Sequence, residues 1–230
     1  MTLYGVELLV ADDPGRAASI LADTLVEAAR AGHAIALTGG HSPGHAYQLA
    51  AEREPDWSKA SLWWGDDRCV PPDDERSNYR LARENLLDRL DAQPAETHRI
   101  RGELGAEAAA DEYDALLKDV RLDLVLLGLG ADGHTASLFP NTPALEERER
   151  RAVPTEAKLE PFVDRVTMTI PVLASAPEVV FIVTGTDKAD AAERAFGRPS
   201  DPGTPASLVR SRAGTTRVVA DRAAASRLQH

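Results

Sequence analysis

The sequence predicts an α/β protein built in three layers. Two observations lead to this fold class. Apolar segments of strand length recur along the chain, and segments of helix length separate them. Such alternation is typical of crossover units, which place helices on both faces of a mostly parallel, Rossmann-like sheet. The 230 residues contain no internal repeat or low-complexity linker, so we expect a single domain over residues 1–230.

The first half of the chain begins with an apolar segment, residues 3–10, that we expect to form a strand. Asp13 and Pro14 then begin an alanine-rich helix to about Ala31, because an aspartate followed by proline is a typical helix start. The further strands predicted here are 34–37 and 61–64, and the further helices are about 43–52 and 77–90.

The second half of the chain continues this alternation. Its predicted strands are 123–127, 166–170, 179–183 and 217–220, and its predicted helices are 103–118, 187–196 and a short one at the end. Residues 141–160 are charged and lack a strong pattern. We expect a solvated loop there, with a mobile cover over a site as the alternative.

Composition restricts the classes of partner. The net charge of −11 argues against a general affinity for nucleic acid or acidic membranes. No apolar run approaches the roughly 20 residues of a membrane helix, and the N-terminus lacks the pattern of a signal peptide. The single cysteine, Cys69, cannot form an internal disulfide, and we expect it to be a packing residue. We therefore expect a soluble cytoplasmic protein, a monomer or weak homo-oligomer, without nucleic-acid or membrane partners.

Three unusual motifs each follow a predicted strand. They are Thr-Gly-Gly-His-Ser-Pro at 38–43, Gly-Asp-Asp-Arg at 65–68 and Gly-Leu-Gly-Ala-Asp-Gly-His at 128–134. In parallel sheets, ligands bind at the carboxyl ends of the strands, near the point where the strand order reverses. The sequence therefore predicts one composite site made from these three loops.

The segment 40–44 matches the G-x-S-x-G elbow of serine hydrolases. That fold uses the backbone N–H after the serine in its oxyanion hole, and here Pro43 has none. We therefore do not expect Ser42 to be a nucleophile. A hydroxyl and helix cap beside an anion is the role we expect, with a cap without ligand as the alternative.

The segment 128–133 matches the G-x-G-x-x-G dinucleotide fingerprint. Pro140 and Pro143 stop any helix after barely two turns, so the usual crossover helix is missing. Asp132 would also repel a pyrophosphate. We therefore expect no nucleotide cofactor, but the glycines still permit tight turns and offer backbone N–H groups to an oxyanion.

His134 directly follows this glycine-rich loop. Histidine is the side chain whose ordinary pKa is close to neutral, so it can take a proton from water and return it. A histidine at a strand end, after an Asp-Gly turn, is therefore the candidate chemical centre. Trp63 and Trp64, at the end of the strand predicted at 61–64, are expected in the core rather than as a platform for a ligand.

These blocks together resemble the 6-phosphogluconolactonase family, within the glucosamine-6-phosphate isomerase superfamily. The most specific block is Asp-Leu-Val-Leu-Leu-Gly-Leu-Gly-Ala-Asp-Gly-His-Thr-Ala-Ser-Leu-Phe-Pro at 123–140. Further similar blocks are 37–43, 64–71 with Ser-Asn-Tyr-Arg at 77–80, 165–171 and 185–188. The family pattern usually has Glu where this chain has Asp67 and Ser or Thr where it has His41, and Ala131 replaces a commoner Pro or polar residue.

The resemblance implies hydrolysis of 6-phosphoglucono-1,5-lactone to 6-phosphogluconate in the pentose phosphate pathway, without a metal or other cofactor. No cluster with zinc-ligand spacing occurs in the sequence either. His134 would be the general base. Asp132 would orient it or bind a sugar hydroxyl, with a plain turn-forming Asp-Gly pair as the alternative.

The resemblance also implies a phosphate clamp of Arg68 and Lys188. The alternatives are an ion pair of Arg68 with Asp66 or Asp67, and an exposed helix position for Lys188. The remaining expected substrate contacts are Gly39, Gly40, Ser42, Asp66, Gly133 and Arg165. For Asp66, the alternative is that it only holds Arg68 in place. For Arg165, the alternative is a structural ion pair. His41 could add positive charge.

Two rival functions stay open. An isomerase or deaminase for amino-sugar phosphates shares the fold, the Gly-Gly loop and a Gly-x-Asp-Gly-His block, but its pattern has Asp-Glu-Tyr at 66–68. The tail Thr-Ala-Ser-Leu-Phe-Pro at 135–140 favours the lactonase. A non-catalytic sugar-phosphate sensor would usually carry a DNA-binding domain, for which this chain has no spare residues or basic patch.

Overall fold

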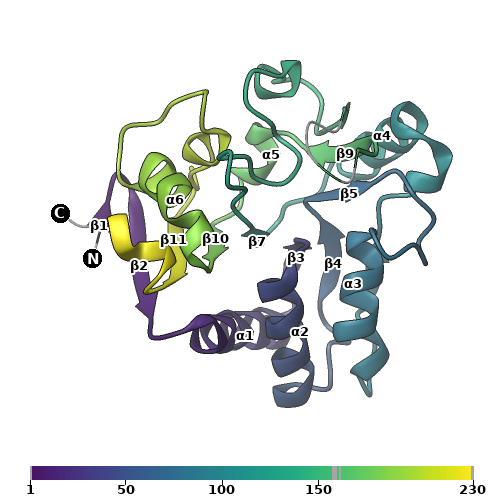
Figure 1. Ribbon diagram of the computed structural model, residues 1–230. Coiled ribbons are helices and arrows are strands. Elements are labelled where there is room, and N and C mark those ends of the chain that lie inside the picture. The colour runs from purple at the N-terminus through teal and green to yellow at the C-terminus, as the bar shows by residue number, and fades with distance from the viewer. Residues whose placement is uncertain (1, 157–159, 161, 229–230) are drawn as a thin grey trace.

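The computed structural model of the chain describes residues 2–156, 160 and 162–228. Its main sheet has eight strands in the order β1-β2-β11-β10-β7-β3-β4-β6 (Figure 1). Neighbouring strands pair in parallel, except β1 with β2. The strands are β1 (Thr2–Leu3), β2 (Val6–Ala11), β3 (Ala34–Leu37), β4 (Ser61–Trp64), β6 (Glu96–His98), β7 (Leu124–Leu127), β10 (Glu178–Val183) and β11 (Thr215–Asp221).

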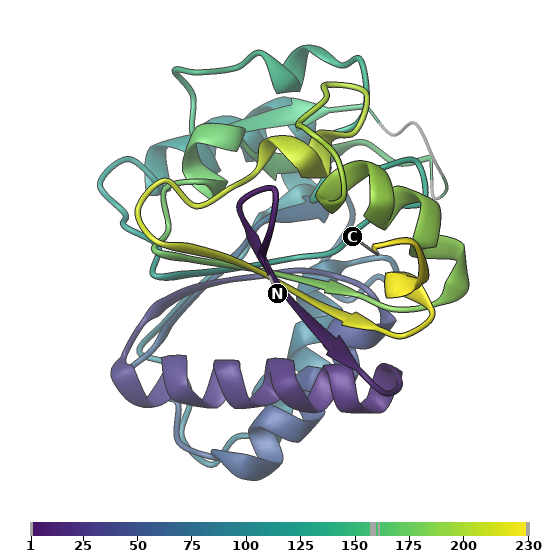
Figure 2. The same cartoon turned by 90° about the vertical axis from the view of Figure 1, so that its left-hand side faces the viewer.

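Helices lie on both faces of this sheet, which confirms the predicted fold class. In Figure 2, the long helix α1 runs below the sheet, and α6 lies above it. The helices are α1 (Pro14–Ala31), α2 (His41–Arg53), α3 (Asn78–Asn85), α4 (Ala106–Leu116), α5 (Ile170–Leu173) and α6 (Ala189–Phe196). Short 3-10 helices are Leu87–Arg89, Gly102–Leu104, Pro143–Leu145, Thr186–Lys188, Pro205–Leu208 and Ala224–Arg227. Among the described helices, none is both long and apolar enough to cross a membrane.

Local signals explain where α1 begins and ends. The Asp13 carboxylate accepts a hydrogen bond of 2.8 Å from the backbone N–H of Arg16, and Pro14 occupies the first turn. Gly32 ends the helix in the left-handed conformation, with φ of 74°. Leu21 and Leu25 are fully buried, so the helix is held by its apolar face.

A second, antiparallel sheet has the order β5-β9-β8, with β5 (Asp66–Arg68), β9 (Arg165–Met168) and β8 (Ala152–Thr155). The strand predicted at 166–170 therefore lies outside the parallel sheet, and it ends at Met168. The helix α4 packs against this small sheet. Together they place Asp66 and Arg68 beyond the end of β4.

The prediction of a solvated loop over 141–160 is wrong for 152–155, which form β8. Proline removes a backbone donor and weakens a strand pattern, so Pro154 obscured this strand. The position is tolerated because β8 is an edge strand. Residues 157–159 of the predicted loop lie outside the described residues.

Several predicted element boundaries also shift. A turn at Tyr4 and Gly5, both with positive φ, divides the strand predicted at 3–10 into a small hairpin. The helix predicted at 77–90 ends at Asn85, and the strand β6 was missed. The helices predicted at 43–52, 103–118 and 187–196 begin at His41, Ala106 and Ala189.

Candidate active site

The strand order reverses between β3 and β7. The chain leaves β3 toward β4 on one side and leaves β7 toward β10 on the other. The loops that follow these two strands therefore diverge and leave a crevice at the carboxyl ends. Two buried tyrosines hold the strand ends there: the Tyr47 hydroxyl donates to the carbonyl of Thr38 at 2.7 Å, and that of Tyr113 donates to the carbonyl of Trp64 at 2.9 Å.

An open cavity of about 200 Å³ lies at this crevice. It brings the three predicted loops together, as the strand-end argument expects. Its lining residues are Thr38, Gly39, Gly40, Asp66, Arg68, Asn78, Gly128, Leu129, Gly130, His134, Thr135, Ala136, Arg165 and Lys188.

Three of the predicted site residues do not line the cavity. Asp132 lies behind His134 and contacts its ring. Gly133 lies against the segment after α6, on the side of the loop away from the cavity. Its nearest neighbours there are Thr204 and Arg194, and its carbonyl accepts from the N–H of Ala206 at 3.0 Å. The Ser42 hydroxyl lies 2.5 Å from that of Thr184.

Ser42 is also not the helix cap that was predicted. The helix α2 begins at His41, and its first turn has no side-chain cap. Gly40 occupies the cap position with φ of 114°, a conformation that favours glycine. His41 is exposed and does not line the cavity.

The ring of His134 is oriented by Asp132. The Nδ1 atom of His134 lies 2.6 Å from Oδ1 of Asp132, and the same oxygen accepts from the backbone N–H of His134 at 3.1 Å. Burial by itself raises the pKa of the Asp132 carboxyl, but the hydrogen bonds from His134 outweigh it and hold that pKa below its usual range. Asp132 therefore both forms the turn and contacts the ring.

The glycine-rich loop uses several of its own N–H groups. The N–H of Gly130 donates to the carbonyl of His134 at 2.8 Å, and that of Gly133 donates to the carbonyl of Gly130 at 2.9 Å. These two donors are therefore not free for an oxyanion, contrary to the general expectation for this loop. Any backbone donors must come from other positions.

Arg68 and Arg165 stand directly opposite each other in the pairing of β5 with β9. Like charges in facing positions of antiparallel strands repel one another. Arg165 is only 4% exposed, and the Nε atoms of both guanidinium groups are buried without a hydrogen-bond partner among the described residues. Burial, and then the nearby charge of Arg68, lower the pKa of Arg165.

Among the residues that the structure describes, neither arginine forms the ion pair that was the alternative prediction. Within the described part of the chain, Arg68 donates from its side chain to the carbonyl of Arg76, and Arg165 lies over the ring of Phe139. Lys188 also lines the cavity; its Nζ lies 3.3 Å from Asp187, and its side chain is 27% exposed.

Asp66 is 4% exposed and belongs to a buried network. Its carboxylate accepts from the Ser137 hydroxyl at 2.6 Å and from the Asn78 amide at 3.3 Å. Asn78 also donates to the carbonyl of Asp66 at 2.9 Å. Sequence reasoning did not name Asn78 as a site residue, although Asn78 lies in the Ser-Asn-Tyr-Arg block at 77–80 that carries part of the family resemblance.

Asp67 points away from the cavity toward the start of α3. Its carboxylate accepts from the backbone N–H groups of Asn78 at 2.6 Å and Tyr79 at 3.0 Å. Burial raises the pKa of this carboxyl to about 6, although the hydrogen bonds oppose that shift. Asp67 is therefore a support for the helix that carries Asn78.

The other lining residues that were not named individually as site residues are Thr38, Gly128, Leu129, Gly130, Thr135 and Ala136. Thr135 donates to the carbonyl of Gly128 at 2.8 Å and so closes the loop on itself. Ala136 has φ of 48°, which is uncommon outside glycine and typical of functional sites. These lining residues lie in or directly after the strand-end motifs, but their residue types do not by themselves indicate a site.

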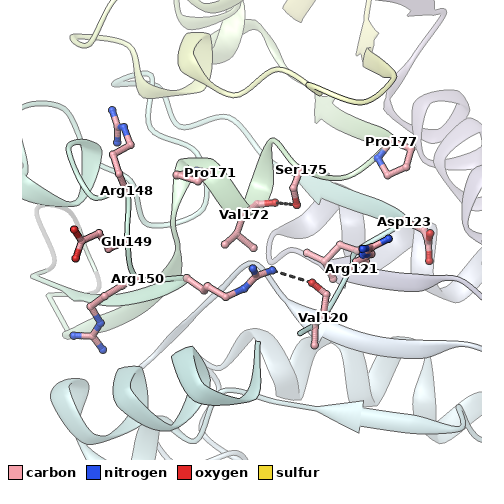
Figure 3. A pocket seen from close by; sticks show the side chains of 12 residues that line it. Val120, Arg121, Asp123, Arg148, Glu149, Arg150, Pro171, Val172, Ser175 and Pro177 are labelled. Atoms are coloured by element: carbon pink, nitrogen blue, oxygen red, sulfur yellow. Dashed lines mark hydrogen bonds between the residues drawn. The ribbon is translucent and has the colours of Figure 1, made fainter. Parts of the chain in front are cut away.

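Two larger cavities lack, among their described lining residues, the combination of a histidine and converging cations that lines the strand-end cavity. One of about 840 Å³ lies beside the start of α4, and none of the described residues that line it is a cation. Another of about 570 Å³ lies at the amino ends of β7 and β10. Figure 3 shows that its Arg148, Glu149 and Arg150 turn away from Val172 and Ser175. Arg151 also lines this cavity, but its guanidinium group donates to the carbonyl of Val120 at 2.9 Å.

Fold and site together define an α/β protein in which one histidine and three cations share a strand-end cavity. That arrangement suits an enzyme acting on a phosphorylated small molecule. Residues 13–218 match the model of the family described as glucosamine-6-phosphate isomerases/6-phosphogluconolactonase. The chain belongs to this family, as the sequence blocks predicted.

Two curated relatives are 39% identical to this chain. The 6-phosphogluconolactonase of Mycobacterium leprae matches over 84% of this chain and 85% of its own, and that of Synechocystis over 73% of each. Rice relatives described as chloroplastic are longer, and the match spans 58% of their length.

Solved structures agree with the fold. The crystal structure of a protein named devB is 30% identical, with a TM-score of 0.87 over 97% of this chain and all of its own. The 6-phosphogluconolactonase from Trypanosoma cruzi is 25% identical, with a TM-score of 0.88 over 100% of this chain and 99% of its own.

Proposed function

We propose that this chain hydrolyses 6-phosphoglucono-1,5-lactone to 6-phosphogluconate, with a phosphate clamp and a histidine-activated water. The enzyme class agrees with the names of its curated relatives. The observation that carries the proposal is the facing pair Arg68 and Arg165 in the cavity of His134. Two like charges without a carboxylate partner in the described part of the chain favour a bound dianion between them.

The phosphate end of the substrate would contact the three cations. Arginine presents planar N–H donors that match phosphate oxygens, whereas lysine supplies a point charge. The buried, unpartnered Nε atoms of Arg68 and Arg165 gain acceptors when a phosphate binds, and Lys188 supplies the third charge. This local charge allows a protein of net charge −11 to bind an anion.

The lactone end would react beside His134. With Nδ1 bound to Asp132, the Nε2 atom takes a proton from water, and the water oxygen bonds to the lactone carbonyl carbon. The tetrahedral intermediate then collapses and the bond from that carbon to the ring oxygen breaks. The imidazolium returns its proton to the ring oxygen, which leaves as a hydroxyl, and the product acid ionises.

Asp132 would act through His134. An ionised carboxylate that accepts from Nδ1 keeps the proton on that nitrogen and leaves Nε2 free as a base, and it stabilises the imidazolium that forms. The lowered pKa of Asp132 keeps it ionised at neutral pH. The backbone of Gly39 and Gly40, at the start of α2, is a candidate donor set for an anion.

The test is an assay of lactone hydrolysis at mildly acidic pH, where the spontaneous reaction is slower. We expect turnover of the phosphorylated lactone and a much higher KM for gluconolactone itself. Equal kcat/KM on the two lactones would contradict the clamp. Ammonia release from glucosamine-6-phosphate without lactonase activity would support the isomerase or deaminase alternative, and binding without turnover would support the sensor.

Two variants test the assigned roles. His134→Ala should lower kcat roughly 100- to 10,000-fold, the usual contribution of a general base. His33→Ala is the matched control, because His33 lies at the opposite end of β3. Arg68→Ala should raise KM roughly 10- to 100-fold, because it removes a charge-assisted hydrogen bond; an unchanged KM would exclude the clamp role.

A cytoplasmic location and a monomeric or weakly associated state also belong to this proposal. Cell fractionation and sedimentation of the purified chain measure them directly.

A further inference from the structure

We infer that Arg194 is a positioning residue for His134: from the outer side of the loop, it holds the backbone that carries Asp132 and His134 in place. Arg194 belongs to α6, and no motif singled it out. The inference rests on the proposed role of His134.

The guanidinium group of Arg194 spans two adjacent carbonyl groups of the histidine loop. Its Nη2 donates to the carbonyl of Ala131 at 2.9 Å, and its Nη1 donates to the carbonyl of Asp132 at 3.2 Å. Nη1 also donates to the Thr204 hydroxyl at 3.1 Å. One rigid, planar group therefore fixes two successive peptide units and connects them to the segment after α6.

The outer side of the loop is closely packed at the next residue. Gly133 has φ of 97°, and a Cβ there would lie 2.8 Å from Cγ2 of Thr204 and 3.2 Å from Nη1 of Arg194. The N–H of Ala206 donates to the carbonyl of Gly133 at 3.0 Å. The loop is thus held on its outer side by Arg194, Thr204 and Ala206.

The inner side of the same loop carries the chemistry. The carbonyl of Asp132 is bound by Arg194, while the carboxylate of Asp132 contacts Nδ1 of His134 at 2.6 Å. A rotation of the Asp132 peptide unit would move that carboxylate and therefore the ring. A displacement of about 1 Å at a reacting group can cost roughly 100-fold in rate, so this anchor affects catalysis without touching substrate.

Arg194 is not an ordinary surface ion pair. In the described part of the chain, its side-chain partners are two carbonyls and one hydroxyl, with no carboxylate. Arg198, just beyond the end of α6, instead pairs with Glu193 at 2.5 Å and is exposed. The two arginines therefore form a matched pair for mutation.

Arg194→Met tests the inference, because loss of a positioning residue should lower kcat and leave KM nearly unchanged. We expect kcat to fall about 10- to 100-fold, as for other residues that orient a reacting group, while KM stays within about twofold. The phosphate-binding cations do not contact Arg194, so KM has no reason to change. Arg198→Met should retain the wild-type kcat and KM.

Arg194→Lys provides a graded second variant, because lysine keeps the charge but cannot span both carbonyls. Its kcat should lie between wild type and Arg194→Met, and it serves as the test if the methionine variant does not fold. Wild-type kcat in a folded variant, or a raised KM with unchanged kcat, would overturn the inference.

A readout independent of activity separates this inference from the proposed function. The ring ¹⁵N resonances of His134 should shift or broaden in Arg194→Met and stay unchanged in Arg198→Met. Unchanged ring resonances in Arg194→Met would overturn the positioning role. If the wild-type chain shows no lactonase activity, the proposed function fails, and the resonances still decide whether Arg194 positions the ring.

Discussion

Gly39 shows how closely the residues of the cavity are packed. A Cβ at this position would lie 1.9 Å from Oδ1 of Asn78, a distance no side chain can occupy. Asn78 in turn donates to the carbonyl of Asp66. At the scale of single residues, the glycine is required by a close neighbour rather than by its own backbone conformation.

Gly39→Ala should displace Asn78 and disturb Asp66. We expect a loss of about 1–3 kcal/mol in the free energy of unfolding, in the range of overpacking, together with reduced activity. Urea unfolding and the lactone assay measure the two effects. Gly128→Ala is the control, because a Cβ there meets nothing within 4 Å; equal stability losses for both variants would contradict the packing argument.

At the scale of elements, the start of α3 depends on the carboxylate of Asp67, which lies in the small antiparallel sheet. Asp67 in β5 accepts hydrogen bonds from the first N–H groups of the helix, which have no partner within it. The Ser77 hydroxyl adds the usual cap by accepting from the N–H of Arg80 at 3.2 Å. β5 and α3 therefore stabilise each other, and both contribute to the cavity.

The burial of Asp67 at this contact makes the free energy of unfolding depend on pH. Burial raises the pKa of Asp67 to about 6 in the folded chain, against about 4 when unfolded. Between these two pH values the folded chain binds more protons than the unfolded chain. The contribution of Asp67 to the free energy of unfolding is therefore fully present below about pH 4 and is lost as pH rises through about 6. The change is about 3 kcal/mol for a shift of two pKa units.

Urea unfolding of wild type and Asp67→Asn at pH 4 and pH 7 measures this effect. The wild-type free energy of unfolding, relative to the variant that does not titrate, should be higher at pH 4 by about 2–3 kcal/mol. A relative stability that is the same at both pH values, or higher at pH 7, would contradict the raised pKa.

At the scale of the whole molecule, the cavity is assembled from both sheets. His134 follows β7 of the main sheet, whereas Arg68 and Arg165 belong to the small sheet. Residues so far apart in the chain meet only when the protein is folded. A ligand of this cavity therefore binds the folded state and stabilises it.

The product 6-phosphogluconate should raise the free energy of unfolding by about 2.7 kcal/mol at a concentration of 100 times its Kd. Gluconate at the same concentration should have little effect, because it lacks the phosphate. Thermal or urea unfolding with each ligand provides the measurement. Equal stabilisation by both compounds, or undiminished stabilisation of Arg68→Ala, would contradict a phosphate clamp.

The sequence by itself determined the family, the parallel sheet with its covering helices, and the three loops of the cavity. These features have local signals. Apolar runs indicate buried strands, Asp13 and Pro14 start α1, and glycine-rich motifs interrupt the chain where β3 and β7 end. Strand ends in a parallel sheet lie at one edge, so the composite site followed from these signals as well.

Only the tertiary structure decided the small sheet and the contacts that complete the site. β5 is three polar residues, Asp66–Arg68, and it is a strand because it pairs with β9 about a hundred residues later. The facing of Arg68 and Arg165 depends on that pairing, and the hold of Arg194 on the Asp132 carbonyl depends on the packing of α6. These contacts join distant segments, and periodicity and capping report only on neighbouring residues.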